Sequence, residues 1–209
     1  MAAVRTIICG SPRLEGNSHA VAGYLADALR LRFPADELRF FSVAQGGVNA
    51  CMGCNSCERT GRCWRSDMMG QVIAALDDST EVFVVSPVYF SGPPSQLKAL
   101  FDRFQPLYYR MLKQSEEMRT NASCPSDSGF DKEQTMIEKR PVYLLAVGDG
   151  GDPHGFSPLE GTCRSAFGVA GYSLRQTLPL IAVDYEDACI RVDKLLEDLG
   201  ESDRCARIQ

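Results

Sequence analysis

The chain has 209 residues, a formal net charge of −5 and a sequence pI of about 5.1, and 44% of its residues are hydrophobic. This length suits a single domain with a sizeable core, and the acidic balance argues against nucleic acid as a partner, because domains that bind it are usually basic. The longest apolar run, Val82–Phe90, is too short to cross a membrane. We expect a cytoplasmic protein, since Met1–Arg5 leads directly into a strand-like segment and shows no signal peptide.

The first half of the chain alternates buried strands with amphipathic helices. The apolar runs predict strands over Val4–Cys9, Leu38–Val43 and Val82–Phe90. Helices are predicted from Ser18, around Met69–Leu76 and from Ser95. Ser18 is a suitable N-cap residue for the first helix, because its hydroxyl can accept a hydrogen bond from a free backbone N–H group.

The second half continues the alternation after a polar insertion at residues 113–140. A connection of that length is either a functional lid or partly disordered. Strands are then predicted over Val142–Val147 and within Leu174–Val183, with helices around Leu159–Ala170 and from Ala188 to Gly200. Strict alternation of strands and helices predicts one doubly wound α/β domain over residues 1–209, with a parallel sheet between two helical layers.

Ligands of doubly wound sheets bind beyond the carboxyl ends of the strands, so the loops after strands one, three and four are the candidate binding segments. The first loop, Gly10–Ser18, combines hydroxyls and a guanidinium with the start of a helix, which suits a phosphate group. It lacks the GxGxxG fingerprint, and Asn17 stands where a P-loop needs lysine, so a monophosphate is the better ligand. A polar strand-to-helix turn without a ligand is the alternative.

The other two loops offer a surface for a flat aromatic ligand. Prolines and a glycine in Ser86–Pro94 make a rigid turn that presents Tyr89 and Phe90 at the strand end. Gly148–Gly155 is rich in glycine, which lets the backbone approach a ligand closely. Each loop alone is also consistent with ordinary packing or a flexible turn, but three suitable loops at the three expected strand ends together indicate a binding site.

With these motifs, the sequence resembles the flavodoxin-like NADPH-dependent FMN reductases and, within them, the iron–sulfur flavoproteins. The matching segments are Gly10–Arg13, Gly16–Ser18, the cysteine segment Cys51–Cys63 followed by Asp67–Met69, Ser86–Tyr89, Gln96–Lys98 and Phe101–Arg103. The resemblance covers the first half of the chain well and the second half mainly through Gly148–Gly151. It implies a flavodoxin-like five-stranded parallel sheet of order 2-1-3-4-5 that binds FMN without a covalent bond.

The resemblance also assigns residues to the parts of FMN. The phosphate would be held by Ser11, Arg13, Gly16, Asn17 and Ser18. The isoalloxazine ring would lie along Pro87, Val88, Tyr89, Phe90 and Ser91, and Gly148, Asp149 and Gly150 would close its other edge. No catalytic side chain is expected, because the redox chemistry belongs to the flavin. Lys98, Asp102 and Arg103 recur in the family pattern, and their helical spacing suits ion pairs at a surface or a subunit interface.

Four of the nine cysteines, Cys51, Cys54, Cys57 and Cys63, lie in one loop at residues 50–66. Their spacing, C-x2-C-x2-C-x5-C, lets one short segment wrap a compact metal centre and resembles the cluster-binding run of ferredoxins. Gly53 and Gly61 would supply the unusual backbone angles that wrapping requires. All four thiols are predicted to bind a 4Fe–4S cluster, while zinc and a redox-active dithiol or disulfide are the alternatives. The other five cysteines share no spacing, and Cys9, Cys163 and Cys189 are expected to be packing residues.

Three functions fit the sequence. The first is an FMN-dependent, electron-transfer iron–sulfur flavoprotein with a small-molecule or protein redox partner. The second is a cluster-free NAD(P)H-dependent FMN or quinone reductase. The third is a flavodoxin-like carrier or zinc-stabilised binding module without enzymatic activity. The first requires the cluster and the flavin to lie close together, across a subunit interface as the resemblance suggests, and therefore predicts a homodimer or homotetramer. Neither nucleic acid nor a membrane is expected as a partner.

Overall fold

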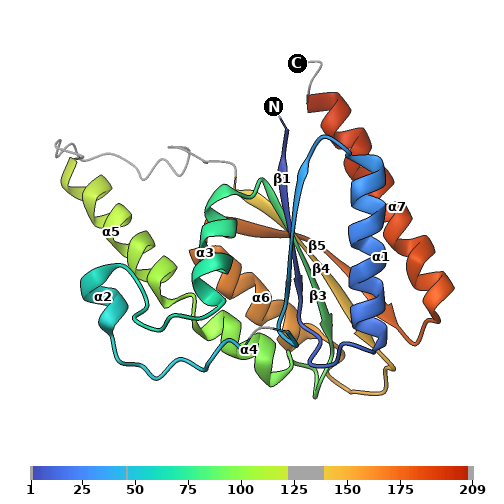
Figure 1. The fold of residues 1–209 in the computed structure, drawn as a ribbon, viewed down its shortest axis with the longest axis horizontal. Helices are drawn as coiled ribbons and strands as arrows, with labels where there is room; N and C mark the ends of the chain where they lie inside the picture. The colour runs from blue at the N-terminus through green and yellow to red at the C-terminus, as the bar shows by residue number, and fades with distance from the viewer. Residues whose placement is uncertain (1, 46, 122–138, 207–209) are drawn as a thin grey trace, which may run out of the picture.

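The computed structural model describes residues 2–45, 47–121 and 139–206. Its centre is one five-stranded parallel sheet in the order β2-β1-β3-β4-β5. The strands are β1 (Val4–Cys9), β2 (Glu37–Ser42), β3 (Glu81–Pro87), β4 (Arg140–Gly148) and β5 (Tyr172–Ile181). This is the predicted strand order, and Figure 1 shows helices on both sides of the sheet. The predicted flavodoxin-like α/β class is therefore confirmed.

The helices divide between the two faces of the sheet. One face is covered by α1 (Asn17–Arg32) and α7 (Tyr185–Ala206). The other is covered by α3 (Met69–Asp78), α4 (Ser95–Asp102), α5 (Gln105–Asn121) and α6 (Ser157–Val169). A short helix, α2 (Ser56–Thr60), lies within the cysteine loop. No helix in the described ranges is both long and apolar enough to span a membrane.

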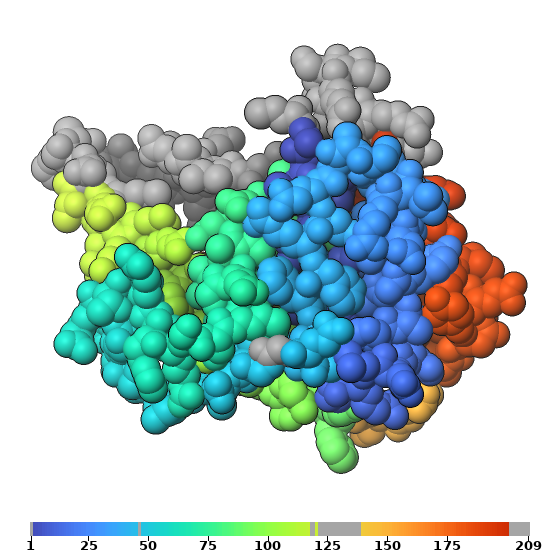
Figure 2. Space-filling view, viewed as in Figure 1, coloured from blue at the N-terminus to red at the C-terminus, as the bar shows by residue number. Residues whose placement is uncertain are grey.

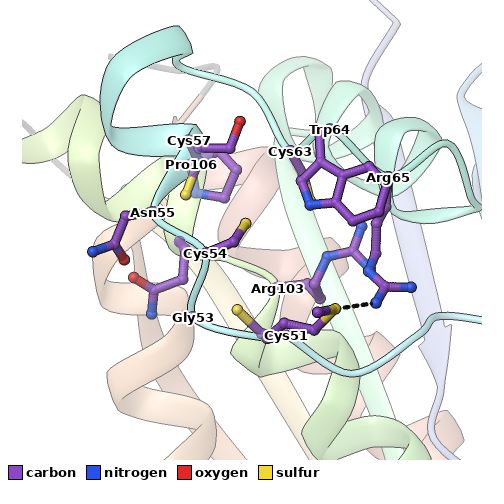
Figure 3. A pocket seen from close by; sticks show the side chains of 13 residues that line it. Cys51, Gly53, Cys54, Asn55, Cys57, Cys63, Trp64, Arg65, Arg103 and Pro106 are labelled. Carbon is purple, nitrogen blue, oxygen red and sulfur yellow. Dashed lines mark hydrogen bonds between the residues drawn. The ribbon is translucent and has the colours of Figure 1, made fainter.

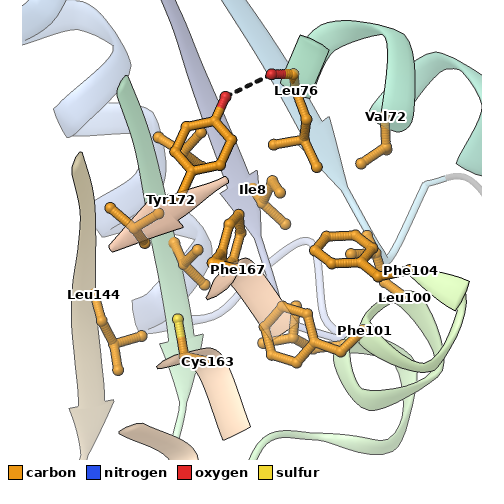
Figure 4. Close-up of a cluster of buried hydrophobic side chains, with 14 of the residues drawn as sticks. Ile8, Val72, Leu76, Leu100, Phe101, Phe104, Leu144, Cys163, Phe167 and Tyr172 are labelled. Atoms are coloured by element: carbon orange, nitrogen blue, oxygen red, sulfur yellow. Dashed lines mark hydrogen bonds between the residues drawn. The ribbon is translucent and has the colours of Figure 1, made fainter. Parts of the chain in front are cut away.

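Alternate residues of the central strands point to opposite faces and so build two cores. Ile7 and Phe83 pack against α1 and α7, whereas Ile8 and Val84 pack against the helices of the other face. Phe101, Phe104, Phe167 and Tyr172 meet edge to face in this second core, with the rings of Phe104 and Phe167 5.5 Å apart (Figure 4). The aromatic contacts fix α4 and the start of α5 against the sheet.

The structure corrects three of the predicted helix boundaries. The first helix begins at Asn17 after an extended Gly16, so Ser18 lies inside the helix and forms no cap. The third predicted helix is two helices, α4 and α5, which breaks the strict alternation. The last helix continues through Gly200 to Ala206.

Residues 113–121 of the polar insertion are helical and continue α5. Residues 122–138, with Cys124, lie outside the described residues.

Candidate functional site

The loops that follow β1, β3 and β4 lie at one edge of the sheet, at the carboxyl ends of the strands (Figure 1). Backbone hydrogen bonds tie this edge together. The N–H of Gly10 donates to the carbonyl of Val85 over 2.7 Å, and the N–H of Val88 donates to the carbonyl of Val147 over 2.9 Å. A third bond, 2.8 Å long, joins Ala182 N–H to the carbonyl of Gly148.

A cleft of about 480 Å³ lies between the loops after β3 and β4. Of the residues that the sequence assigned to a flavin, it is lined by Val88, Phe90, Ser91, Gly148, Asp149 and Gly150. Its remaining wall includes Gly151, Asp152 and Gly155, which belong to the glycine-rich loop that the sequence proposed as a binding segment. Phe156, Pro179 and Ile181 complete the wall, and the sequence did not predict them. The volume is in the range of cofactor sites, and the walls combine apolar side chains with backbone groups.

The turn after β3 is tight and carries unusual backbone angles. Tyr89 and Gly92 exchange two backbone hydrogen bonds of 2.9 Å, and the two residues between them, Phe90 and Ser91, have φ angles of +48° and +63°. Both angles are left-handed, as in a type I′ turn, which favours glycine or asparagine at these positions. Phe90 is fully exposed at the tip of the turn. The turn is held in place by the N–H of Leu159, which donates to the carbonyl of Ser91 over 3.0 Å.

The loop after β4 brings backbone close to the cleft. Gly150 and Gly151 have φ angles of +84° and +87°, which residues other than glycine rarely adopt. A Cβ atom on Gly148 would lie 3.4 Å from the Cβ of Val88, on the facing loop. The two loops are therefore in close contact at Gly148, where a side chain would lie against Val88.

The loop after β1 has the features of an anion site but does not line this cleft. Ser11 and Ser18 are buried, whereas Arg13 and Asn17 are exposed. The Ser11 hydroxyl donates to the carbonyl of Arg13 over 2.7 Å and accepts from its N–H over 3.2 Å, which fixes the bend before α1. In the first turn of α1 the N–H groups of His19 and Ala20 both donate to the carbonyl of Gly16 over 2.9 Å, so those of Asn17 and Ser18 are the ones that this helix start offers to an anion.

Gly10 explains why this loop can sit so close to the sheet. A Cβ atom at Gly10 would come within 2.5 Å of Cδ2 of Leu97, a buried residue of α4. Only glycine leaves room for this packing. The loop after β1 and helix α4 are therefore in direct contact.

A second cavity, of about 210 Å³, is formed by the cysteine loop and the start of α5 (Figure 3). All four clustered cysteines, Cys51, Cys54, Cys57 and Cys63, line it. Gly53 and Gly61 have left-handed φ angles of +64° and +70°, which are the unusual backbone angles expected there, and Asn55 shares this conformation with a φ of +55°. In the space-filling view this segment forms the left edge of the molecule, together with α5 (Figure 2).

The thiols of this cavity differ in their electrostatic surroundings. Hydrogen bonding from the backbone of Ser56 lowers the pKa of the Cys54 thiol, whereas burial raises the pKa of Cys57. Among the residues that the structure describes, no three His, Cys, Asp or Glu side chains converge as one metal ion would require. The four thiols line one cavity without converging on a single point.

Arg103 contradicts the prediction of a surface ion pair. It lies between α4 and α5, is only 2% exposed and lines the cysteine cavity. Its Nη1 and Nη2 atoms donate to the two carboxylate oxygens of Asp67 over 2.8 and 3.0 Å, and Nη1 also donates to the carbonyl of Asn49 over 2.8 Å. The prediction holds for its neighbours, since Lys98 and Asp102 form an exposed pair of 2.6 Å.

The charge of the Arg103–Asp67 pair is maintained despite burial. Burial lowers the pKa of the Arg103 guanidinium, but Asp67 and the nearby Cys63 outweigh it, so this pKa is raised. For Asp67, burial acts to raise the pKa, and the bonds from Arg103 and from the backbone overcome it, so this pKa is lowered. Both groups are therefore charged at neutral pH. The pair closes the cysteine loop onto the end of α4.

The remaining described cysteines are packing residues to different degrees. Cys9 and Cys163 are fully buried, as predicted, and burial raises the pKa of the Cys163 thiol to about 12. Cys189 on α7 is half-buried.

Comparisons with known proteins identify the family of the chain. Residues 6–159 match the family model for NADPH-dependent FMN reductases. An iron-sulfur flavoprotein of Methanocaldococcus jannaschii is 36% identical over 100 residues, which are 48% of this chain and 51% of the relative. An iron-sulfur flavoprotein of Archaeoglobus fulgidus is 32% identical over 104 residues, 49% of this chain and 46% of the relative. The matched segment thus spans about half the length of these relatives.

The fold has relatives among solved structures. The flavodoxin of Streptococcus pneumonia TIGR4 superimposes with a TM-score of 0.53 over 96% of this chain and 99% of the other, at 12% identity. At this identity the likeness concerns the fold alone. The family match covers most of the chain and includes the loops after β1, β3 and β4. The chain therefore belongs to the family of NADPH-dependent FMN reductases, which are FMN-dependent oxidoreductases.

Proposed function

We propose that this protein is an electron-transfer iron–sulfur flavoprotein, which uses FMN and a 4Fe–4S cluster to move electrons between a reduced donor and an acceptor. The observation that carries the proposal is that all four clustered cysteines line one cavity, in a chain that also has a cleft between the loops after β3 and β4. The names of the relatives support the same assignment.

FMN fits the edge of the sheet in two parts. Its ring would occupy the cleft, between the turn Pro87–Ser91 and the loop Gly148–Gly150. Its phosphate would lie at the start of α1, where Ser11, Gly16, Asn17 and Ser18 offer hydroxyl, amide and backbone N–H groups and Arg13 offers a guanidinium. When bound, FMN supplies the hydride and electron chemistry. The chain contributes binding, orientation and an open face: Tyr89 is 42% exposed and Phe90 fully exposed beside the cleft.

The four cysteines fit a cluster because each thiolate of a 4Fe–4S centre binds a different iron atom, so the thiols surround the cluster. The left-handed residues Gly53, Asn55 and Gly61 bend the loop around such a space. Cys54, whose thiol has a lowered pKa, forms a thiolate more readily than an unperturbed cysteine. The buried guanidinium of Arg103 adds positive charge to the cavity wall.

The two cavities are separate within one chain, since no described residue lines both. A homodimer or homotetramer in which the cysteine loop of one subunit approaches the cleft of another would shorten the path between them. We include this assembly, a cytoplasmic location, and a small-molecule or protein redox partner in the proposal.

The second candidate is a cluster-free NAD(P)H-dependent FMN or quinone reductase with thiols in place of the cluster. The family match and the exposed face of the cleft favour it, because a nicotinamide can stack on an accessible flavin without a fingerprint of its own.

Purification without oxygen, followed by absorbance and metal analysis, separates the candidates. We expect flavin bands, a broad absorbance that bleaches on reduction, and about four iron atoms per chain. Flavin without iron contradicts the cluster and leaves the cluster-free reductase, which steady-state oxidation of NADPH would then identify. A colourless chain that cannot be reconstituted with FMN contradicts both candidates.

A further inference from the structure

We propose that Arg103 is a positioning residue for the iron–sulfur site: its Nε–H donates a hydrogen bond to the sulfur that Cys63 contributes to the cluster, and this bond raises the reduction potential of the cluster. The proposal rests on the cluster of the proposed function. It concerns a donor that the Arg103–Asp67 ion pair does not use.

The hydrogen bonds of Arg103 leave that donor free. Nη1 and Nη2 are held by Asp67, and Nη1 by the carbonyl of Asn49 as well. Nε is fully buried and has no hydrogen-bond partner among the described residues. An unpaired donor on a charged, buried group costs free energy, because the N–H group loses its hydrogen bond to water on folding and forms no other. Such a donor indicates a missing acceptor.

The position of the side chain identifies that acceptor as sulfur. Arg103 lines the cavity together with the four cysteines, and Figure 3 shows its side chain between Cys51 and Cys63. Cys63 is close enough to act on the guanidinium electrostatically. A neutral thiol is a weak acceptor, whereas an iron-bound thiolate carries negative charge and accepts strongly.

The surroundings hold the donor in one place. Asp67 accepts two hydrogen bonds from the guanidinium, and these fix the plane of the group and the direction of its Nε–H bond. Phe101 and Phe104, which lie on either side of Arg103 along the chain, are packed into the aromatic core. A fixed donor changes the potential more reproducibly than a mobile surface charge.

The effect on the potential follows from charge. An electron that the proposed function takes from reduced FMN adds one negative charge to a site that already carries four thiolates. A hydrogen bond to a ligating sulfur stabilises the added charge, and therefore favours the reduced state. Because the cavity wall is buried at Arg103, water competes little for this donor.

Two variants distinguish the effect of the Nε–H hydrogen bond on the potential from the effect of charge alone. In Arg103→Gln combined with Asp67→Asn the ion pair is replaced by two neutral side chains of similar shape, so the formal net charge is unchanged and the donor is lost. In Arg65→Gln the net charge falls by one, but the altered residue is a less buried arginine that lines the same cavity. The midpoint potential of each holoprotein is measured by redox titration, with electron paramagnetic resonance of the reduced cluster as the signal.

We expect the double variant to shift the reduction equilibrium at least tenfold towards the oxidised cluster, which is about 59 mV for one electron, and Arg65→Gln to shift it less. A shift below twofold in the double variant, or a larger shift in Arg65→Gln, overturns the proposal. If the double variant does not fold, Arg103→Lys decides: it keeps the charge but lacks Nε–H, and we expect at least a threefold shift, with no shift overturning the proposal.

Iron analysis of the wild-type protein distinguishes the two levels of failure. A wild-type chain without iron overturns both the proposed function and the role of Arg103. A wild-type chain with a cluster whose potential does not respond to these substitutions overturns the role of Arg103 alone.

Discussion

At the scale of single residues, Arg13 is the side chain on which the phosphate assignment is most easily tested. It is exposed, and Ser11 fixes its backbone through two hydrogen bonds. A guanidinium–phosphate bond is charge-assisted and contributes about 1.5–3 kcal/mol. We therefore expect Arg13→Ala to weaken FMN binding roughly tenfold to a hundredfold, measured by titrating the apoprotein with FMN and following flavin fluorescence.

Arg30→Ala is the matched control for Arg13. Arg30 is also an exposed arginine, but it lies in the last turn of α1 and pairs with Asp27. An equal loss of affinity in both variants, or none in Arg13→Ala, would refute the assignment of Arg13 to the phosphate.

Tyr172 gives a pH-dependent test of the packing behind α3. Its hydroxyl donates to the carbonyls of Leu76 and Ser79, and burial raises its pKa to about 12. The folded state holds this proton more tightly than the unfolded state, whose tyrosines titrate near about 10. The stabilisation is therefore complete below about pH 10 and is lost as the pH rises towards 12.

We expect Tyr172→Phe to lower the free energy of unfolding by about 1 kcal/mol at pH 7, because one buried hydroxyl is removed while Arg140 still donates to both carbonyls. By about pH 11 the wild type should have lost about 1.4 kcal/mol from this group, so the gap closes. Urea unfolding at pH 7 to 11 measures it, with Tyr108→Phe, an exposed tyrosine, as control. A gap that stays constant over this range would show that Tyr172 ionises equally in both states.

At the scale of elements, Gly200 near the end of the last helix can be interpreted in two ways. The sequence suggested that Gly200 ends the helix, because glycine is common just after a helix terminus. In the structure α7 continues to Ala206, and a Cβ atom at Gly200 would meet nothing within 4 Å. Gly200→Ala should then raise the free energy of unfolding by about 0.5–1 kcal/mol, measured by urea unfolding.

Gly171→Ala is the opposite case. Gly171 has a φ of +82°, directly before β5, so alanine there is strained and should destabilise the protein. If Gly200→Ala also destabilises, the helix ends at Gly200 as the sequence suggested.

The turn Tyr89–Gly92 shows why some elements resist prediction. The prolines and Gly92 predict a rigid turn. The residue types Phe90 and Ser91 do not predict left-handed φ angles, because their side chains disfavour them. The neighbouring hydrogen bond from Leu159 and the two-residue loop impose them. Backbone strain of this kind is typical of positions that contact ligands.

At the scale of the whole molecule, the two cavities predict independent loading. They share no described lining residue. We expect Cys57→Ser to lose most of its iron while retaining one FMN per chain with unchanged affinity. Iron analysis and flavin titration measure the two quantities, and Cys189→Ser, a half-buried cysteine on α7, should keep both. A parallel loss of FMN would mean that the cysteine loop supports the flavin cleft.

The strand order and the two flanking helical layers could be predicted because local apolar patterns and family motifs report on them directly. The buried ion pair could not. Arg103 and Asp67 are separated along the chain, and only the folding of the cysteine loop against the end of α4 brings the carboxylate within 2.8 Å of the guanidinium. Helical spacing alone placed Arg103 with its exposed neighbours Lys98 and Asp102. Which residues at the end of α4 face the core depends on the tertiary packing of Phe101 and Phe104.

The far wall of the cleft was missed for a similar reason. Pro179 and Ile181 carry no motif, and they reach the site only because β5 pairs with β4 in parallel register. Likewise, Phe156 enters the cleft just before α6 begins. Cysteines, glycines and charged loops are recognisable in a sequence, whereas apolar residues acquire a role at a site only through the topology.

The position of the cysteine loop between β2 and β3 has a consequence for the order in which the protein matures. Every residue that lines the cysteine cavity has been synthesised once Pro106 is added, whereas the last residue of the cleft, Ile181, is added much later. Synthesis runs from the N-terminus, and early segments fold first. The growing chain therefore contains all four clustered thiols before the residues that complete the proposed flavin cleft have been added.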